Sequence, residues 1–488
     1  MNKKQNNYLI IDIGTGNLRV ALATANGEIL AIEREDVQYY KDDHYKEALY
    51  FQPDQLWGQI KKLTQRISNA HKGNNIIAIT VSSQREGIVI IDKNGKSIIG
   101  LPNHDHRGRH WENLINDSEL IYEKTGRLPS SLFSALKVIG LREGRPDLYK
   151  KLDYITSISD WCQFKLSGVL GYEHSQASET LLYDVKGKKW SDELVEMFGL
   201  NPSILPSLYD SEEILGKILP SIARELGLSK EVKIIVGGAD TQLAIKSTVP
   251  SLNDIVIVSG TTTPVVQVIP DFITDIKKAT WTNRNVDDEN FILETNAGVT
   301  GLNIQRLKEI FYPNEDYAVM EEEMTGFGIE KCVASLGSLV ASENTPLTSG
   351  GFIFETPISH NLKRADFILA AYWDLANSIK ENFNYLAKLT NYSKNYVWGC
   401  GGGFQSRVFG QMLSNLINRE IRIRPGFKDA TVIGGIITCN QALGLVSTSV
   451  EASTSIHPHQ PGEKEILAEK KWEDLRKSLS DNLYTKTL

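Results

Sequence analysis

Cysteine is scarce in this sequence: Cys162, Cys332, Cys400 and Cys439 are the only four in 488 residues, and no two of them form a Cys-x-x-Cys pair. This spacing argues against a disulfide scaffold and a zinc site, and it is typical of buried thiols in a reducing compartment. An excess of positive charge is also lacking, because 53 Lys and Arg stand against 60 Asp and Glu, a net charge of −7. Such a chain has no general attraction for nucleic acid or for an anionic membrane.

Long apolar runs are missing too, since no stretch reaches the roughly 18 apolar residues that a membrane-spanning helix needs. The first apolar stretch, residues 8–13, contains Asp12 and is too short and too polar for a signal peptide. We therefore expect a cytoplasmic protein without a membrane partner. The sequence does have the composition of a globular protein, with 41% hydrophobic and 23% charged residues, and a length that suggests about two or three domains.

The first part of the chain predicts a strand-rich unit. Short β-favouring runs at residues 8–13, 18–24 and 28–32 are separated by a tight glycine turn and an Asn-Gly turn, which predicts a β-meander. Apolar residues three and four positions apart predict a helix over 53–70, and the apolar run over 75–81 predicts the next buried strand. The expected order is three strands, a helix and a strand.

A second unit of related construction is predicted from residue 255 onwards, where a strand, a Gly-Thr turn and another strand recur over 255–268. The later elements expected here are helices over 365–389, 406–417 and 431–442 and strands over 396–399 and 420–423. We place the first domain at residues 1–249, the second at 250–446 and a polar, helical tail at 447–488.

The first glycine-rich turn lies between two predicted strands. Gly14 lets the backbone approach a phosphate closely, and Thr15 and Asn17 can donate hydrogen bonds. Asp12, just before the turn, is placed to hold a magnesium ion directly or through water. An ordinary hairpin turn whose aspartate caps its own backbone fits the same residues.

Two more glycine-rich turns follow at strand ends. Residues 259–263 combine Gly260 with three threonine hydroxyls, and residues 399–403 precede a helix start, where amide groups favour an anion or leave room for a nucleobase. A β-turn and a helix-start loop are the alternatives for these two segments. Each turn alone is weak evidence, whereas three glycine-rich turns at strand ends in this order form a much more specific pattern.

In these motifs the sequence resembles the FGGY family of carbohydrate kinases, which includes glycerol kinase, xylulokinase, gluconate kinase and the autoinducer-2 kinases. The resemblance covers residues 7 to 445. The segments that carry it are Asp12 to Arg19 (first phosphate motif, Asp-x-Gly-Thr-x-x-x-Arg), Ser82 to Gly87 (substrate loop), Ser259 to Thr262 (second phosphate motif), and Gly401 to Gly403 with Gln411 and Asn415 (adenosine motif). The implied fold class is α/β, with two ribonuclease-H-like (actin-like ATPase) domains flanking a central cleft.

The resemblance also implies ATP and Mg²⁺ as cofactors, with Asp12 as the metal ligand and Asp240 as the catalytic base. The implied nucleotide-binding residues are Gly14, Thr15, Asn17, Arg19, Gly260, Thr261, Thr262, Gly402, Gly403 and Phe404. The implied substrate-binding residues are Gln84, Arg85, Glu86, Asp105, Asp240 and Thr241.

The residues themselves support part of this assignment. Asp240 follows a predicted strand in a Gly-Gly-Ala-Asp turn, where a carboxylate can accept the proton of an attacking sugar hydroxyl. Its alternative is an N-cap for a helix that starts at Thr241. Arg85 with Glu86 places a donor fork beside an acceptor, as polyol recognition requires, and the alternative is an ion pair on the surface.

The predicted function is ATP-dependent phosphorylation of a hydroxyl of a small sugar, polyol or related compound. Leu132 stands where glycerol kinases carry a substrate-contacting tyrosine, and residues 87–89 and 241–243 are more similar to those of autoinducer-2 kinases than to those of xylulokinases. Two rival functions share the motifs: an actin-like or chaperone-type ATPase without sugar transfer, and a catalytically silent sugar-sensing module. Whether the chain forms a homodimer is left open by the sequence.

Overall fold

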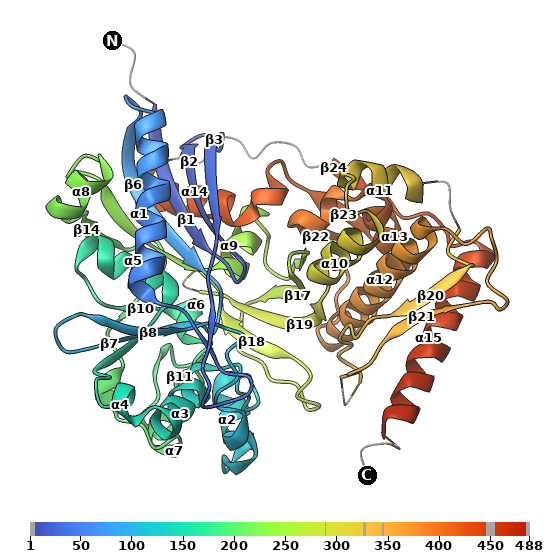
Figure 1. The fold of residues 1–488 in the computed structure, drawn as a ribbon, viewed down its shortest axis with the longest axis horizontal. Coiled ribbons are helices and arrows are strands. Elements are labelled where there is room, and N and C mark those ends of the chain that lie inside the picture. The colour runs from blue at the N-terminus through green and yellow to red at the C-terminus, as the bar shows by residue number, and fades with distance from the viewer. Residues whose placement is uncertain (1–4, 288, 326–327, 344–345, 446–453, 485–488) are drawn as a thin grey trace. The chain divides into compact units, whose positions relative to one another are not determined.

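The computed structural model describes residues 5–287, 289–325, 328–343, 346–445 and 454–484, and Figure 1 shows the fold as a ribbon. The chain divides into two compact units, each built from three segments. Unit 1 comprises Met1–Ser247, Ile269–Ile292 and Ala430–Val450, and unit 2 comprises Thr248–Val268, Leu293–Asp429 and Glu451–Leu488.

Unit 1 is organised around a six-stranded sheet of order β14-β15-β6-β1-β2-β3. Its strands are β1 (Asn6–Ile13), β2 (Asn17–Thr24), β3 (Ile29–Asp36), β6 (Asn75–Ser83), β14 (Ile214–Lys217) and β15 (Lys233–Ala239). Strands β1, β2 and β3 pair antiparallel, and β6 pairs parallel to β1. The predicted meander, helix and strand are therefore confirmed.

Both faces of this sheet are covered by helices. Successive side chains of β1 point to opposite faces, so this strand contributes apolar residues to both cores. Leu9 and Ile11 join a core cluster with the apolar face of α1 (Pro53–Ala70). Tyr8 and Ile10 join a second cluster with α14 (Ala430–Ala442). The run of consecutive apolar residues in β1 thus reports a strand that is buried on both sides.

The position of α14 differs from the single cut that we predicted at residue 249, because this helix belongs to unit 1 although it follows most of unit 2 in the chain. Two glycines allow it to pack closely. A Cβ at Gly434 would lie 2.0 Å from the backbone oxygen of Leu243 in α9 (Asp240–Ser247), and one at Gly435 would lie 2.9 Å from Ile10 Cγ2. Close packing of small residues returns the chain to the first sheet.

The remaining elements of unit 1 surround this core. They are β4 (Tyr40–Lys41), β5 (Leu49–Tyr50), β7 (Ile88–Ile91), β8 (Ser97–Leu101), α2 (Ser118–Thr125), α3 (Ser134–Gly144), α4 (Pro146–Tyr149), β9 (Tyr154–Ser157), α5 (Ile158–Ser167), β10 (Tyr172–Glu173), α6 (His174–Ala177), β11 (Tyr183–Asp184), β12 (Lys189–Trp190), α7 (Asp192–Met197), β13 (Leu208–Tyr209), α8 (Pro220–Leu226), β18 (Trp281–Arg284) and the short 3₁₀ segments Arg109–Leu114 and Pro202–Ile204.

Unit 2 contains the consecutive sheet neighbours β19-β17-β16-β22-β23-β24. Its elements are β16 (Ile255–Val258), β17 (Thr262–Ile269), β19 (Phe291–Val299), α10 (Gly301–Phe311), α11 (Tyr317–Met324), β20 (Cys332–Ser335), β21 (Gly351–Phe354), α12 (Arg364–Leu389), β22 (Tyr396–Cys400), α13 (Arg407–Ile417), β23 (Glu420–Ile423), β24 (Thr454–Ile456), α15 (Glu463–Tyr484) and the 3₁₀ segments Gly402–Gln405 and Phe427–Asp429. The helices and strands predicted from residue 255 onwards are all present, and one of them, α14, belongs to unit 1.

The tail is more integrated than a helical appendage. Strand β24 extends the sheet by pairing antiparallel with β23, and α15 packs against β20. Trp472 of α15 donates from Nε1 to the buried carboxylate of Asp374 at 2.7 Å, and Arg476 donates to Ser338 Oγ at 3.0 Å. Part of the predicted tail, residues 446–453, lies outside the described residues. The described tail is therefore a structural part of unit 2.

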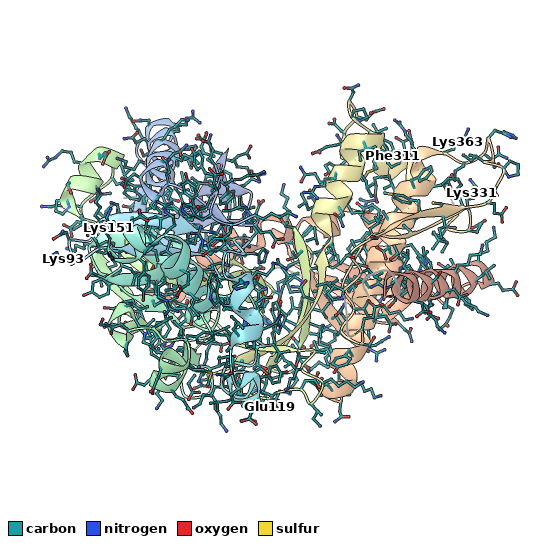
Figure 2. All side chains as sticks on the ribbon, turned by 60° about the horizontal axis from the view of Figure 1, so that its bottom comes forward. Lys93, Glu119, Lys151, Phe311, Lys331 and Lys363 are labelled. Atoms are coloured by element: carbon teal, nitrogen blue, oxygen red, sulfur yellow. The ribbon has the colours of Figure 1, made fainter. Side chains whose placement is uncertain are left out.

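Lys93 and Lys151, which Figure 2 labels, are exposed charged side chains of unit 1. Within the ranges that the structure describes, no helix combines the length and apolar character required to cross a membrane. All four cysteines are buried and free, as the sequence led us to expect.

Candidate active site

Asp12 occupies the end of β1, where strand pairing places it opposite Arg19 on β2 and beside Ser82 on β6. Its side chain is 2% exposed and forms an ion pair with Arg19, and the Ser82 hydroxyl donates to Asp12 Oδ1 at 3.4 Å. The Gly14 amide donates to the Asn17 carbonyl at 3.0 Å and closes the turn between the strands. The first motif therefore presents a buried carboxylate beside a tight glycine turn.

The Gly-Thr turn is held from behind by three polar side chains. Tyr39 donates its hydroxyl to the Thr15 carbonyl at 2.6 Å, and Asn103 donates its amide to Thr15 Oγ1 at 2.9 Å. Gln84 donates to the Gly14 carbonyl at 3.3 Å and accepts from the Asn103 backbone at 2.9 Å. Sequence reasoning missed Tyr39 and Asn103, because neither belongs to the turn motif itself.

Asp240 lies at the junction of β15 and α9, as the Gly-Gly-Ala-Asp pattern suggested. Its Oδ1 accepts the Thr241 backbone N–H at 2.6 Å and the Thr241 hydroxyl at 3.2 Å. The surrounding protein raises the pKa of Asp240 to about 6, first by burial and then by the negative charge of Asp12, while Arg85 and Thr241 oppose the rise. Its side chain keeps intermediate exposure, so a ligand can reach it. Unit 1 thus brings Asp12, Arg85 and Asp240 together.

A buried network supports the turn that carries Asp240. The Ala239 amide donates to Ser175 Oγ at 3.0 Å, and this hydroxyl donates in turn to Glu173. Burial raises the pKa of Glu173 to about 8. Gly237 permits the close approach of the chain here, since a Cβ at this position would lie 2.0 Å from the Val81 carbonyl. The sequence offered no signal for this network, because its parts come from separate segments.

Arg85 and Glu86 are buried, at 7% and 6% exposure, so the alternative of an ion pair on the surface is wrong. Arg85 Nε lies 3.8 Å from Glu86 Oε1, and its Nη1 lies 3.7 Å from Oε1 of Glu179. Burial and the charge of Glu179 hold the pKa of Glu86 well above its usual range, against the opposing charges of Arg85, Arg127 and Lys137. Glu179 and Arg127 were absent from the predicted site.

Asp105 belongs to the same charged region but is fully buried. Its two oxygens accept from the Leu49 backbone at 2.9 Å and from Arg107 Nε at 2.7 Å, so it fixes the loop that carries it. Lys137 donates to the backbone carbonyl of Asn103 at 2.9 Å, and burial holds its pKa below the usual range of a lysine. The role of Asp105 as a substrate ligand stays a prediction.

In unit 2 the second and third glycine-rich turns meet at Ser259. The Ser259 amide donates to the Cys400 carbonyl at 2.8 Å, and the Gly403 amide donates to the Ser259 carbonyl at 3.0 Å. A Cβ at Gly401 would lie 2.4 Å from the Ser259 carbonyl oxygen, and one at Gly403 would lie 2.0 Å from Ser259 Oγ. Glycine is therefore required at both positions for the two turns to touch.

The start of α10 packs on the second turn. Thr300 donates its amide to the Thr261 carbonyl at 3.1 Å, and a Cβ at Gly301 would lie 2.1 Å from the Gly260 carbonyl oxygen. Gly260, Thr261 and Thr262 remain exposed, and so does Gly402. These exposed turns form the candidate nucleotide surface of unit 2.

Three residues near the third turn have structural partners. Phe404 is buried, with its ring 5.7 Å from that of Phe409, so it supports the turn from below. Gln411 donates to the His457 carbonyl at 2.9 Å, and Asn415 accepts from the His459 amide at 2.8 Å. Both amide side chains therefore hold the tail segment that follows β24.

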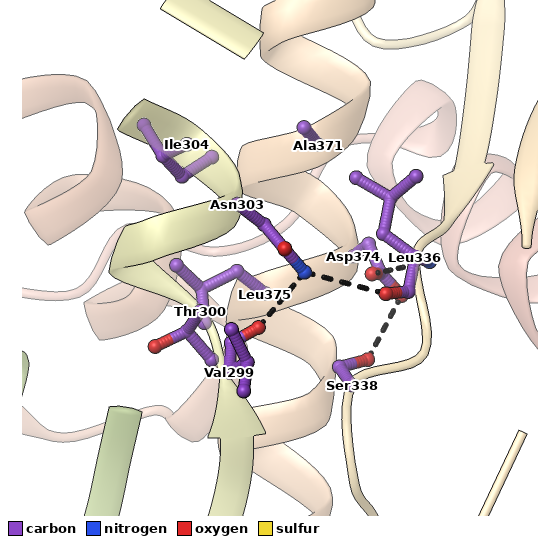
Figure 3. A pocket seen from close by; sticks show the side chains of 9 residues that line it. All are labelled: Val299, Thr300, Asn303, Ile304, Leu336, Ser338, Ala371, Asp374 and Leu375. Atoms are coloured by element: carbon purple, nitrogen blue, oxygen red, sulfur yellow. Dashed lines mark hydrogen bonds between the residues drawn. The ribbon is translucent and has the colours of Figure 1, made fainter. Parts of the chain in front are cut away.

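A cavity between α10 and α12 has a volume of about 10 Å³, room for a single water at most. In Figure 3, Asn303 at its edge donates to the carbonyls of Val299 and Leu336, while Asp374 accepts from Leu336 and Ser338. Its size excludes a nucleotide, so we attribute the cavity to packing.

Comparison with known proteins agrees with this geometry. The model of the N-terminal domain of the FGGY family of carbohydrate kinases matches residues 7–246, and the model of its C-terminal domain matches residues 338–443. The solved xylulose kinase of Lactobacillus acidophilus superposes with a TM-score of 0.82 at 16% identity, covering 99% of both chains. The fold is therefore the two-domain, actin-like ATPase fold.

Two relatives carry the likeness in sequence. A Bacillus subtilis (strain 168) protein described as "Putative sugar kinase YoaC" is 48% identical over 466 residues, 95% of each chain. The autoinducer-2 kinase of Klebsiella pneumoniae is 24% identical over 459 residues, covering 90% of this chain and 86% of the relative. The chain belongs to the FGGY family of carbohydrate kinases, and it is an enzyme of carbohydrate phosphorylation that takes its phosphoryl group from ATP.

Proposed function

We propose that this kinase transfers the γ-phosphoryl group of ATP to a hydroxyl of a small polyhydroxy compound, with Asp240 as the general base. The observation that carries the proposal is the placement of Asp240 beside Arg85 and Asp12, with a pKa raised to about 6. A base with this pKa is ionised at neutral pH and still takes up a proton more readily than an ordinary aspartate. Such a group suits the deprotonation of an alcohol.

The two oxygens of Asp240 have different tasks in this proposal. Oδ1 is held by the backbone and hydroxyl of Thr241, which fixes the orientation of the carboxylate. The proton of the attacking hydroxyl is therefore taken up on Oδ2. The network of Ser175 and Glu173 holds the turn that carries Asp240. Arg85, whose charge acts on Asp240, would orient the sugar hydroxyls.

The chemistry of Asp12 fits a magnesium ion. Mg²⁺ prefers a few carboxylate oxygens together with waters and substrate phosphates, and a single buried carboxylate next to an open glycine turn matches that pattern. A Cβ at Gly16 would meet no atom within 4 Å, so the turn has space in front of it. Bound there, Mg²⁺ would neutralise the charge of the transferring phosphoryl group. Among the described residues, no cluster of three or more His, Cys, Asp or Glu side chains offers a competing site.

The nucleotide and the sugar are assigned to different residues. The exposed turns at Gly260 to Thr262 and at Gly402 and Gly403, together with Gly14, Thr15, Asn17 and Arg19, would bind the nucleotide. The proposed sugar ligands are Gln84, Arg85, Glu86, Asp105, Asp240 and Thr241. Phosphate binding by amide-rich turns and hydroxyl recognition by an Arg-Glu pair both follow from hydrogen-bond geometry.

The test is a coupled ADP-release screen with glycerol, D-xylulose, D-gluconate and dihydroxypentanedione as acceptors. The likeness to autoinducer-2 kinases makes dihydroxypentanedione the first compound to try. We expect ADP release that depends on one acceptor and on magnesium. ATP turnover at the same rate with and without every acceptor would instead favour an ATPase without sugar transfer. The cytoplasm, which supplies ATP and keeps the buried thiols reduced, is the proposed location.

A further inference from the structure

Glu179 is a buried carboxylate that lies outside every sequence motif of the site. It follows α6 in the chain and is 1% exposed. One of its oxygens, Oε2, accepts from Arg127 Nη2 at 2.7 Å. Arg127 is itself held by the Ser178 carbonyl at 3.1 Å and by Asn283. One oxygen of the Glu179 carboxylate is therefore held in place by Arg127.

The other oxygen of Glu179 is in a different situation. Oε1 is buried and accepts no hydrogen bond from any residue that the structure describes. Arg85 Nη1 lies 3.7 Å from this oxygen, just beyond hydrogen-bond range. A buried carboxylate oxygen without a hydrogen-bond donor destabilises the folded state. The position of Glu179 Oε1 beside Arg85 therefore requires an explanation.

The charge of Glu179 also acts on Glu86. Four charged groups influence Glu86: Glu179 favours its protonated form, whereas Arg85, Arg127 and Lys137 favour its ionised form. Burial is the largest cause that raises the pKa of Glu86 above its usual range, and the charge of Glu179 adds to it. A protonated carboxyl can donate a hydrogen bond, which an ionised one cannot.

We propose that Glu179 is a positioning residue of the sugar pocket: its carboxylate orients the Arg85 guanidinium toward the sugar, and its charge, together with burial, favours the protonated, hydrogen-bond-donating form of Glu86. This inference rests on the proposed function, because it takes Arg85 and Glu86 as the residues that contact the sugar. The pocket then presents a fixed cation and a neutral donor side by side. That pair suits an acceptor that has neighbouring hydroxyl or carbonyl oxygens.

The experiment compares Glu179→Gln and Glu179→Asp with the wild type, using the acceptor that gives the highest kcat/KM in the ADP-release screen. Glutamine keeps the size and removes the charge, while aspartate keeps the charge and shortens the reach. We expect both to raise the KM for the acceptor by about 5- to 150-fold, the range for one lost polar contact in a buried site. The KM for ATP should stay within about twofold, because the nucleotide turns of unit 2 do not depend on Glu179.

The pH dependence separates positioning from a purely structural role. In the wild type, the acceptor KM should rise above neutral pH as Glu86 ionises. In Glu179→Gln this rise should begin at lower pH, because the charge that opposed the ionisation of Glu86 is gone, whereas Glu179→Asp should keep the wild-type midpoint. Glu86→Gln, a permanent neutral donor, should remove the rise altogether. Glu212→Gln is the matched control, since it deletes a half-buried carboxylate paired with Lys246 and should change neither KM.

One further variant, Arg85→Ala, and the wild-type pH profile make each failure recognisable. If Arg85→Ala leaves the acceptor KM unchanged, the proposed sugar pocket itself is refuted. If Arg85→Ala raises the acceptor KM but both Glu179 variants leave KM and its pH midpoint unchanged, the role of Glu179 is refuted. Circular dichroism shows whether Glu179→Gln is folded. If it is not, the wild type still provides a test: an acceptor KM that does not rise with pH would refute the protonated form of Glu86.

Discussion

The pH dependence of turnover is the sharpest consequence of the site geometry. A general base must be ionised to act, and the pKa of Asp240 is raised to about 6 from an ordinary value of 3.8. At pH 5, one unit below that pKa, about a tenth of the carboxyl is ionised, so kcat/KM for the acceptor should fall about tenfold. An aspartate with its ordinary pKa would still be more than about nine-tenths ionised at pH 5.

The sign of the stability effect keeps this prediction separate from acid unfolding. A carboxyl whose pKa is raised by folding stabilises the folded state when it is protonated. The contribution of Asp240 to the free energy of unfolding therefore decreases as pH rises from about 4 to 6. Acidification from pH 7 to pH 5 therefore does not destabilise the fold through this group. Circular dichroism at pH 5 checks that the whole protein remains folded.

The assay is initial-rate ADP release at saturating ATP and magnesium between pH 5 and 8, for the wild type and Asp240→Asn. Asparagine keeps the shape and the bonds to Thr241 but cannot take up the proton, so kcat should drop by about 10²- to 10⁴-fold and the residual rate should lose its acidic limb. An acidic limb that persists in the pH profile of Asp240→Asn would come from protonation of ATP instead. A wild-type kcat/KM that stays level down to pH 5, or a variant with more than about a tenth of wild-type kcat, would refute the assignment of Asp240.

Three other expectations follow from single contacts. Gly403→Ala should raise the KM for ATP at least about tenfold. The new Cβ would lie 2.0 Å from Ser259 Oγ, so the two turns proposed to bind the nucleotide would have to move apart. Unchanged ATP binding by calorimetry would contradict this expectation. Trp472→Phe removes a hydrogen-bond donor to the buried carboxylate of Asp374. It should lower the free energy of unfolding of unit 2, measured in urea, by about 1.5 to 3 kcal/mol. An unchanged urea midpoint would mean that α15 does not unfold cooperatively with unit 2. Chelation of metal should abolish ADP release and magnesium should restore it, because the magnesium ion proposed at Asp12 would neutralise the charge of the transferring phosphoryl group. Full activity in chelator would exclude a magnesium site there.

Local patterns were enough to determine most of the elements. The β-favouring runs on either side of the turn at Gly14 formed two antiparallel strands, and the three-and-four spacing over 53–70 formed α1 with the predicted bounds. Such signals are local because backbone hydrogen bonding within a hairpin or helix joins residues that are close in sequence. The glycine-rich turns likewise kept their predicted places at strand ends.

Other features depended on segments that are distant in the sequence. Helix α14 packs on the first sheet because Gly434 and Gly435 allow close contact there, and no local pattern states which sheet a small-residue helix will cover. The tail gained a sheet strand, β24, in the same way. Element type was predictable in both cases, but the packing partner was chosen by shape complementarity in the folded chain.

The candidate site shows the same division. Sequence alone predicted Asp12, Arg85, Glu86 and Asp240 as site residues, because each lies in a recognisable turn or motif. Only the tertiary structure revealed Glu179, which follows a short helix with no motif of its own and meets Arg85 across 94 positions of the chain. Burial and charge at that meeting point set the pKa of Glu86. The type of chemistry was thus readable from residue identity, whereas the protonation state and orientation of the groups arose from low-dielectric packing of distant segments.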